Sequence, residues 1–296
     1  MDKRKFLRSL VFLPLTVSVM HLDELAKVTA PLTSTEKMPV LFLGHGSPMN
    51  AIEENEFVDG FRQVGKEIPR PAAILCISAH WETRGTYVTA MEKPMTIHDF
   101  GGFPQELFDV QYPAPGSPKL ALETQSLVET AEVGLDEKWG LDHGAWSVIK
   151  HLYPEADVPV IQLSLDYYRT PRDHYALASE LKALREKGVL IIGSGNMVHN
   201  LRMVAWNKLR EPGYGFDWAL EAQGKMRKLI LDGDHTSLID YSSQGKAFEL
   251  AIPTPEHFLP LLYALALKDA KDQVILFNDK AVGGSLTMTS VKISRA

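Results

Sequence analysis

Short apolar runs alternate with longer helical segments from near Met38 onward, and this alternation restricts the folds open to the chain. Several of the apolar runs are continuous, which is typical of strands that are covered on both faces. We expect strands at residues 40–43, 73–78, 87–90, 158–163, 189–192, 274–277 and 286–293. The alternation predicts a single-domain α/β fold, in which a central, mostly parallel or mixed β-sheet carries helices on both faces.

Helices are expected at residues 118–132, 171–187, 217–231 and 255–268. The second has clear boundary signals, because Thr170 can cap it, Pro171 suits its first position and Gly188 can end it. In the last helix, Pro260 lies in the first turn, where proline is better tolerated than in the interior. Residues 101–118 are rich in Pro, Gly and aromatic side chains, and we expect them to form a long ordered loop.

The chain has 296 residues, 45% of them hydrophobic, which is enough for one large core or for two modest domains. The lack of an internal repeat or a low-complexity linker favours one domain. The net charge is −6, and no Lys/Arg-rich run occurs beyond the N-terminus, so nucleic acid is not an expected partner. The one cysteine, Cys76, excludes an intrachain disulfide and a cysteine-based zinc cluster. Composition leaves the oligomeric state open.

The N-terminal segment, residues 1–37, allows two interpretations. Its basic stretch "DKRKFLR" and the following apolar run resemble a twin-arginine export signal in which Lys3 replaces the first arginine. Pro14 inside the apolar run and the lack of a small-x-small cleavage site favour instead an N-terminal extension of a cytoplasmic protein. Cytoplasm and periplasm therefore both stay open, and the run is too short for a stable membrane span.

Histidines follow several of the expected strands. His45 lies in "VLFLGHGSP", His80 follows the next strand, His199 follows "LIIGSG", and His257 precedes an expected helix. Because ligands bind at the carboxyl ends of strands in open α/β sheets, we expect these imidazoles to converge if the strands are parallel neighbours. Three or four imidazoles suit zinc or ferrous iron. The alternative is that each histidine is an ordinary hydrogen-bonded loop residue, and that the glycines around His45 form a tight turn.

Other motifs are less specific. "GSGNMV" lacks the third glycine of a dinucleotide fingerprint, "GHGSP" around Ser47 is not a nucleophile elbow, and no P-loop occurs. His143 in "LDHGAW" is predicted to be a substrate contact or part of a helix cap. Asp99, beside His98 in the long loop, could contribute a salt bridge or a turn.

Seven motifs in order resemble the class III extradiol ring-cleavage dioxygenases, in particular the branch that acts on DOPA: "GHGSPMN", "SAHWET", "TIHDFGGFP", "YPAPGSP", "GLDHGAW", "GSGNMVHNL" and "PTPEHFLPL". The resemblance extends from about Met38 to the C-terminus. It implies one catalytic domain at residues 38–296 with one divalent metal in a cleft at the sheet edge.

The resemblance also implies roles for single residues. The metal ligands would be His45, His80, His199 and His257, and His199 would also act as the acid–base group. His143 would face the substrate ring, with Ser47 and Asp99 as further substrate contacts. Glu256 lies beside the last ligand, so its contribution to the metal shell is left open.

The implied reaction is the insertion of O2 beside the diol of a catechol such as DOPA, which gives a ring-opened semialdehyde. Close relatives suggest Zn²⁺, whereas the redox chemistry requires a metal such as Fe²⁺, because zinc has none. Two alternatives stay open: a zinc-dependent hydrolase that uses a metal-bound water, and a non-catalytic binder of aromatic ligands. Oxygen uptake with a catechol separates the dioxygenase from the hydrolase.

Overall fold

A computed structural model describes residues 36–295 of the chain. Residues 1–35, which hold the candidate export signal, lie outside this range, so that hypothesis stays a prediction. Among the helices of residues 36–295, none is both long enough and apolar enough to cross a bilayer.

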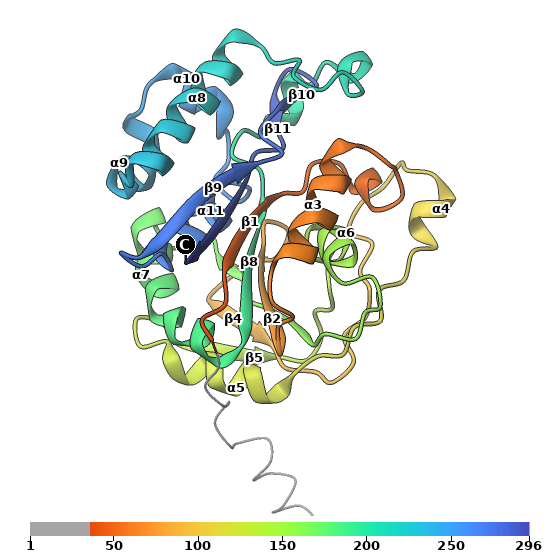
Figure 1. Ribbon diagram of the computed structural model, residues 1–296, viewed down its shortest axis with the longest axis vertical. Coiled ribbons are helices and arrows are strands. Elements are labelled where there is room, and N and C mark those ends of the chain that lie inside the picture. The colour runs from red at the N-terminus through yellow and green to blue at the C-terminus, as the bar shows by residue number, and fades with distance from the viewer. Residues whose placement is uncertain (1–35, 296) are drawn as a thin grey trace, which may run out of the picture.

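The centre of the fold is a six-stranded mixed sheet with the strand order β6-β2-β8-β1-β12-β9 (Figure 1). The first four strands of this order are mutually parallel, β12 is antiparallel to β1, and β9 is antiparallel to β12. The bounds are β1 (Val40–Gly44), β2 (Ala73–Ser78), β6 (Val160–Gln162), β8 (Val189–Gly195), β9 (Asp272–Phe277) and β12 (Ser290–Arg295). The predicted α/β class and mixed sheet are confirmed.

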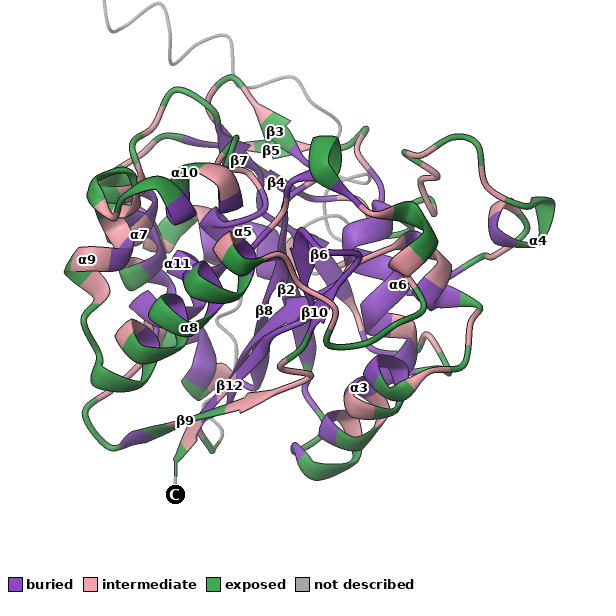
Figure 2. Cartoon of the chain, turned by 90° about the horizontal axis from the view of Figure 1, so that it is seen from above, coloured by how far each residue is buried: buried purple, intermediate pink, exposed green. Residues whose placement is uncertain are grey.

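Helices cover both faces of this sheet, and the buried strands lie between the two helical layers (Figure 2). One layer contains α3 (Glu56–Glu67) and α6 (His143–Leu152). The other contains α5 (Pro118–Leu127), α7 (Pro171–Glu180), α8 (Asp217–Asp232), α10 (Lys246–Ala251) and α11 (Leu259–Ala266), with α9 (His235–Ile239) beside them.

Residues of β1 alternate between these two cores. Val40 and Phe42 pack into one core, Leu41 and Leu43 pack into the other, and all four are fully buried. A strand that is apolar on both faces must be covered on both faces, which explains why the continuous apolar runs predicted the layers.

Shorter elements complete the fold. Three two-stranded pairs are β3 (Glu82–Thr83) with β7 (Leu165–Asp166), β4 (Thr86–Thr89) with β5 (Val133–Asp136), and β10 (Ala281–Val282) with β11 (Leu286–Thr287). The long loop contains the short helix α4 (Gln105–Phe108). The 3₁₀ helices are η1 (Pro48–Ala51), η2 (Leu181–Lys187), η3 (Leu201–Met203), η4 (Trp206–Lys208) and η5 (Tyr241–Ser243).

Several predicted boundaries were wrong. The helix expected at 118–132 ends at Leu127, because residues 133–136 pair with β4. The helix expected at 171–187 changes to the 3₁₀ helix η2 after Glu180, although it begins at a Thr170 capping box and closes at Gly188, as predicted.

Two further boundaries affect the site. The helix expected at 255–268 begins only at Leu259, and the preceding turn carries His257. The strand expected at 286–293 is divided into β11 and β12 at Met288, whose backbone lies against the end of β1. A Cβ on Gly44 would lie 2.6 Å from the Met288 carbonyl oxygen, so this close approach requires glycine.

Candidate metal centre

Three neighbouring parallel strands bring the histidine-bearing segments together. His45 directly follows β1, His80 follows β2, and β8 lies between these strands. The backbone N–H of His45 donates to the carbonyl oxygen of Gly195 at 3.0 Å, at the end of β8. The expected convergence at the carboxyl ends of the strands is therefore present in the structure.

His257 reaches this edge through a backbone contact with the end of β8. The Asn196 N–H donates to the His257 carbonyl oxygen at 2.9 Å. A Cβ on Gly195 would lie 2.1 Å from that oxygen, so only glycine lets the His257 turn lie this close to β8. Gly46 adopts φ = +65°, which glycine accommodates most easily, as the chain turns away after His45.

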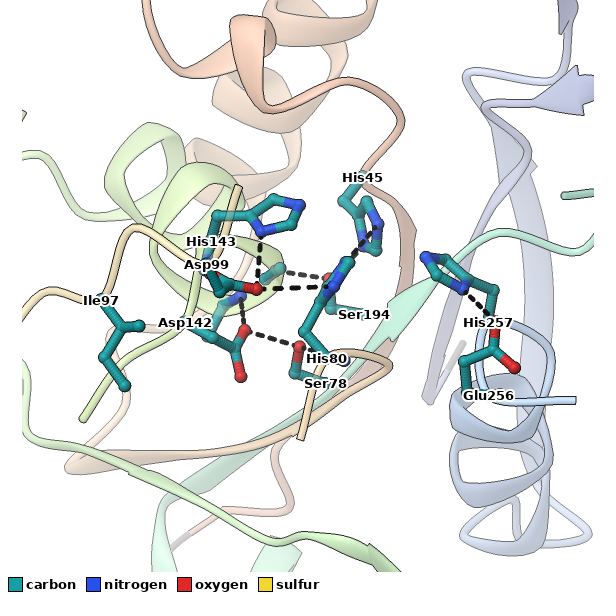
Figure 3. Close-up of polar contacts among 12 residues, drawn as sticks. His45, Ser78, His80, Ile97, Asp99, Asp142, His143, Ser194, Glu256 and His257 are labelled. Carbon is teal, nitrogen blue, oxygen red and sulfur yellow. Dashed lines mark hydrogen bonds and ion pairs between the residues drawn. The ribbon is translucent and has the colours of Figure 1, made fainter. Parts of the chain in front are cut away.

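The imidazoles of His45, His80 and His257 point toward a common centre (Figure 3). Each offers a ring nitrogen, and the three nitrogens lie within 4.8 Å of one another. Nε2 of His45 and Nε2 of His80 are 3.2 Å apart. His45 and His257 are buried, and His80 is partly buried.

The second nitrogen of each ring contacts a neighbouring oxygen. The Ser194 hydroxyl donates to the Gly144 carbonyl at 2.5 Å, so its oxygen accepts from Nδ1 of His45 at 3.0 Å. Glu256 Oε1 accepts from Nδ1 of His257 at 3.0 Å.

Nδ1 of His80 lies 3.5 Å from Oδ2 of Asp99, which places an acceptor at this ring as well. In all three rings the proton is thus assigned to Nδ1, which leaves the Nε2 lone pair free to bind a ligand. Glu256 thereby has a defined contact with Nδ1 of His257.

The geometry fits a divalent metal. Two unprotonated nitrogens repel each other unless a cation lies between them. In a tetrahedral site with bonds of about 2.0–2.1 Å, neighbouring ligand nitrogens are about 3.3 Å apart, close to the distance between His45 and His80.

The electrostatics agree with metal binding. Burial, followed by the neighbouring histidines, lowers the pKa of His45 and His257 well below the ordinary value. Burial and His143 lower the pKa of His80 to about 3, against a smaller opposing effect of Asp99. The rings are therefore neutral at pH 7, which is the protonation state that binds metals.

His199 lies next to this group but outside it. Its ring stacks on His257 with centroids 3.5 Å apart and an interplanar angle of 8°. It forms a second group of potential ligands with His257 and Glu256, and burial lowers its pKa to about 4. Its role as a fourth metal ligand stays a prediction.

His143 and Asp99 lie on the other side of the three histidines. The His143 ring centroid is 3.9 Å from that of His80, and Nδ1 of His143 donates to Oδ2 of Asp99 at 2.9 Å. The other oxygen of Asp99 accepts the backbone N–H of His143 at 2.8 Å. Burial acts to raise the pKa of Asp99, but the hydrogen bonds with His143 outweigh it and leave the pKa lowered.

Ser47 and Asp99, predicted as substrate contacts, both have contacts within the protein. Asp99 uses both oxygens on His143, as described above. The Ser47 side chain accepts from the Met49 N–H at 3.2 Å and caps η1. Their contacts with substrate stay predictions.

Two residues that support the site were not predicted from the sequence. Asp142 is fully buried, caps α6 and thereby positions His143 as the first residue of that helix. Its position before "HGAW" was a usable N-cap signal. Ser194, which supports His45, had no such signal, because it lies inside an apolar strand and its role depends on strand pairing.

An α/β fold with convergent neutral imidazoles at the carboxyl edge of its sheet is suited to a metal-dependent enzyme. The chain matches the family model described as the catalytic LigB subunit of aromatic ring-opening dioxygenase over residues 39–285, and it belongs to this family.

Named relatives agree with this assignment. The chain is 45% identical over 266 residues to the 4,5-DOPA dioxygenase extradiol of Escherichia coli K12, covering 88% of this chain and 97% of that protein. It is 35% identical over 267 residues to the Beta vulgaris protein of the same name, with 86% and 95% covered. The crystal structure of an uncharacterized Escherichia coli K12 protein superimposes with a TM-score of 0.75 at 40% identity, covering 87% of this chain and 100% of the other.

These findings confirm the predicted class of enzyme. The chain is an extradiol aromatic ring-opening dioxygenase, and the family uses a metal for which the histidine groups of this structure are suitable.

Proposed function

We propose that this enzyme cleaves a catechol such as DOPA beside its diol, with ferrous iron at the centre formed by His45, His80 and His257. Both atoms of O2 enter the product, which is a ring-opened semialdehyde. The observation that carries the proposal is the convergence of these three neutral imidazoles. The imidazoles of His143 and His199 lie beside them. The names of the relatives support DOPA as a substrate.

When bound, ferrous iron supplies the electron transfer between catechol and O2, which zinc lacks because it has no redox chemistry. The protein supplies the ligands and the proton acceptors. Asp99 accepts a hydrogen bond from Nδ1–H of His143. Nε2 of that ring therefore carries the lone pair and can accept a proton from a catechol hydroxyl.

His199 is the second proton acceptor in the proposal. Burial lowers its pKa to about 4, so the ring is neutral at pH 7 and its nitrogen lone pair is not already protonated. Its stacking against His257 holds the ring at the edge of the metal group. We assign His199 to acid–base catalysis, with metal ligation as the alternative role that the test below separates.

The test is oxygen consumption together with the yellow absorbance of a semialdehyde, measured with Fe(II)-loaded protein and L-DOPA. His199→Gln should lower kcat about 10²–10⁴-fold, as expected for loss of an acid–base group. The metal content of this variant should stay near that of the wild type, whereas loss of metal would assign His199 as a ligand. Ester or amide hydrolysis by the zinc form, without oxygen uptake from any catechol, would contradict the dioxygenase proposal.

A further inference from the structure

A cavity of about 710 Å³ lies beside the metal centre, within the size range of small-molecule sites. Three of its lining residues are linked to site histidines through the chain, a β-bridge or ring packing. Ser47 lies two residues after His45, and Leu286 forms a β-bridge with His199.

The third is Phe103, which packs on the ring of Phe100 at 5.4 Å between centroids, and Phe100 in turn packs edge-on against His143 at 5.5 Å. The lining thus includes residues linked to His45, to His199 and, through Phe100, to His143. This cavity is the proposed site for a substituent on a catechol ring held at the metal centre.

The walls of the cavity are mainly apolar, with Phe57, Leu209, Val282 and Met288 among the lining residues. Its charged lining residues are Glu53, Glu54 and Arg210. Glu54 accepts two hydrogen bonds from Arg62 and is therefore already paired.

Glu53 and Arg210 form a different kind of pair. Their side chains come from two separate loops, and Glu53 Oε1 lies 3.7 Å from Arg210 Nη2. The Arg210 side chain is 94% exposed and that of Glu53 is 38% exposed. Such a long, solvated ion pair adds little to stability, so each group can exchange its partner for an incoming charge.

We propose that Glu53 and Arg210 determine substrate specificity by binding a zwitterionic amino-acid side chain on the catechol. The Arg210 guanidinium pairs with the carboxylate of the substrate, and the Glu53 carboxylate pairs with its ammonium group. This inference rests on the proposed function and narrows its substrate class to catechols that carry a 2-amino acid.

The experiment compares four catechols with the Fe(II)-loaded full-length enzyme. L-DOPA carries both charges, dopamine lacks the carboxylate, 3-(3,4-dihydroxyphenyl)propionate lacks the ammonium group, and 4-methylcatechol lacks both. Arg210→Gln should raise KM about threefold to tenfold for the two carboxylates and leave the other two substrates unchanged. Glu53→Gln should raise KM by a similar factor for the two amines alone.

Lys208→Gln and Glu211→Gln provide matched controls. These residues form an exposed ion pair in the same loop as Arg210, with Nζ and Oε1 2.8 Å apart, and neither lines the cavity. Both controls should leave KM unchanged for all four catechols.

Equal effects of Arg210→Gln on all four substrates, or no effect on any, would overturn the inference. So would a wild-type enzyme that opens 4-methylcatechol as efficiently as L-DOPA, although the proposed function would then stand. A wild-type enzyme that opens none of the four would overturn the proposed function and this inference together.

Discussion

Buried ionisable side chains gather at both ends of the central sheet, and the two groups differ in how their hydrogen bonds are satisfied. At the end opposite the histidines, Arg185 and Asp272 are fully buried, with Nη1 and Oδ2 2.6 Å apart. Arg185 also donates to the carbonyl oxygens of Met38 at 2.8 Å and Leu267 at 2.7 Å. These bonds join the starts of β1 and β9 to the segments before β8 and after α11.

At the histidine end, by contrast, two acceptors face each other. Its outward nitrogens are satisfied by Ser194, Asp99 and Glu256, but Nε2 of His45 and Nε2 of His80 face each other at 3.2 Å. Acceptors that face one another need a partner from outside the protein. Burial of ionisable groups is common to both ends, whereas buried lone pairs directed at each other distinguish the end that is suited to bind a metal.

The largest effect that tests this comparison is expected for His80→Ala. Loss of one of the three proposed ligands should reduce the metal content to less than about a tenth and abolish oxygen uptake, because the two remaining imidazoles bind metal much more weakly. Metal analysis after anaerobic purification is the measurement. His235→Ala is the control, since His235 contacts Tyr175 on the far layer and should retain full metal.

At the opposite end, Arg185→Met should act on stability alone. It leaves the Asp272 carboxylate buried without its cation, which typically costs about 3–5 kcal/mol of unfolding free energy. Urea denaturation measures the loss, and the double change Arg185→Met/Asp272→Leu should recover part of it. Loss of metal from folded Arg185→Met protein would contradict the separation of the two ends.

A smaller effect, on metal affinity, is expected for Glu256→Gln. The amide keeps an acceptor for Nδ1 of His257 but loses the charge, and such changes behind a ligand typically lower metal affinity about 10–100-fold. Competition with a chelator measures the affinity. Glu249→Gln, on the exposed face of α10, should leave it unchanged.

The smallest effect concerns His174, a buried histidine that contacts the Tyr263 hydroxyl away from the metal centre. Burial, followed by Arg169, lowers its pKa to about 4. The unfolded chain binds this proton below about pH 6.5 and the folded chain does not, so stability falls as pH drops from about 6.5 toward 4.

Replacing His174 should make the unfolding free energy depend less on pH. His174→Gln should lose about 2 kcal/mol less unfolding free energy than the wild type between pH 7 and pH 5. Urea denaturation at both pH values measures the difference. Parallel losses in the two proteins would show that His174 does not titrate as inferred.

Much of this arrangement could be predicted from the sequence, because apolar strands and the residues that follow them are local signals. The positions of His45 and His80 after β1 and β2 are examples. The contacts of Ser194 with His45 and of Asp99 with both His80 and His143 could not be predicted, because they depend on strand order and on the path of a long loop.

The boundary errors have a similar physical origin. Residues 255–258 carry helix-start signals, but the backbone contact between His257 and the end of β8 holds them in a turn instead. The interruption at Met288 also depends on a distant partner, the glycine that ends β1. Tertiary contacts decide such positions, and sequence patterns do not contain them.

The contact of Gly195 with the His257 carbonyl has a consequence for how the enzyme acquires its metal. Because main-chain hydrogen bonds to the end of β8 set the spacing of His45 and His257, the backbone entropy of these two proposed ligands has already been lost in the folded chain. Metal capture then requires little reorganisation, and the affinity benefits from this rigidity. A Gly195→Ala change would therefore impair loading while leaving every coordinating atom chemically intact.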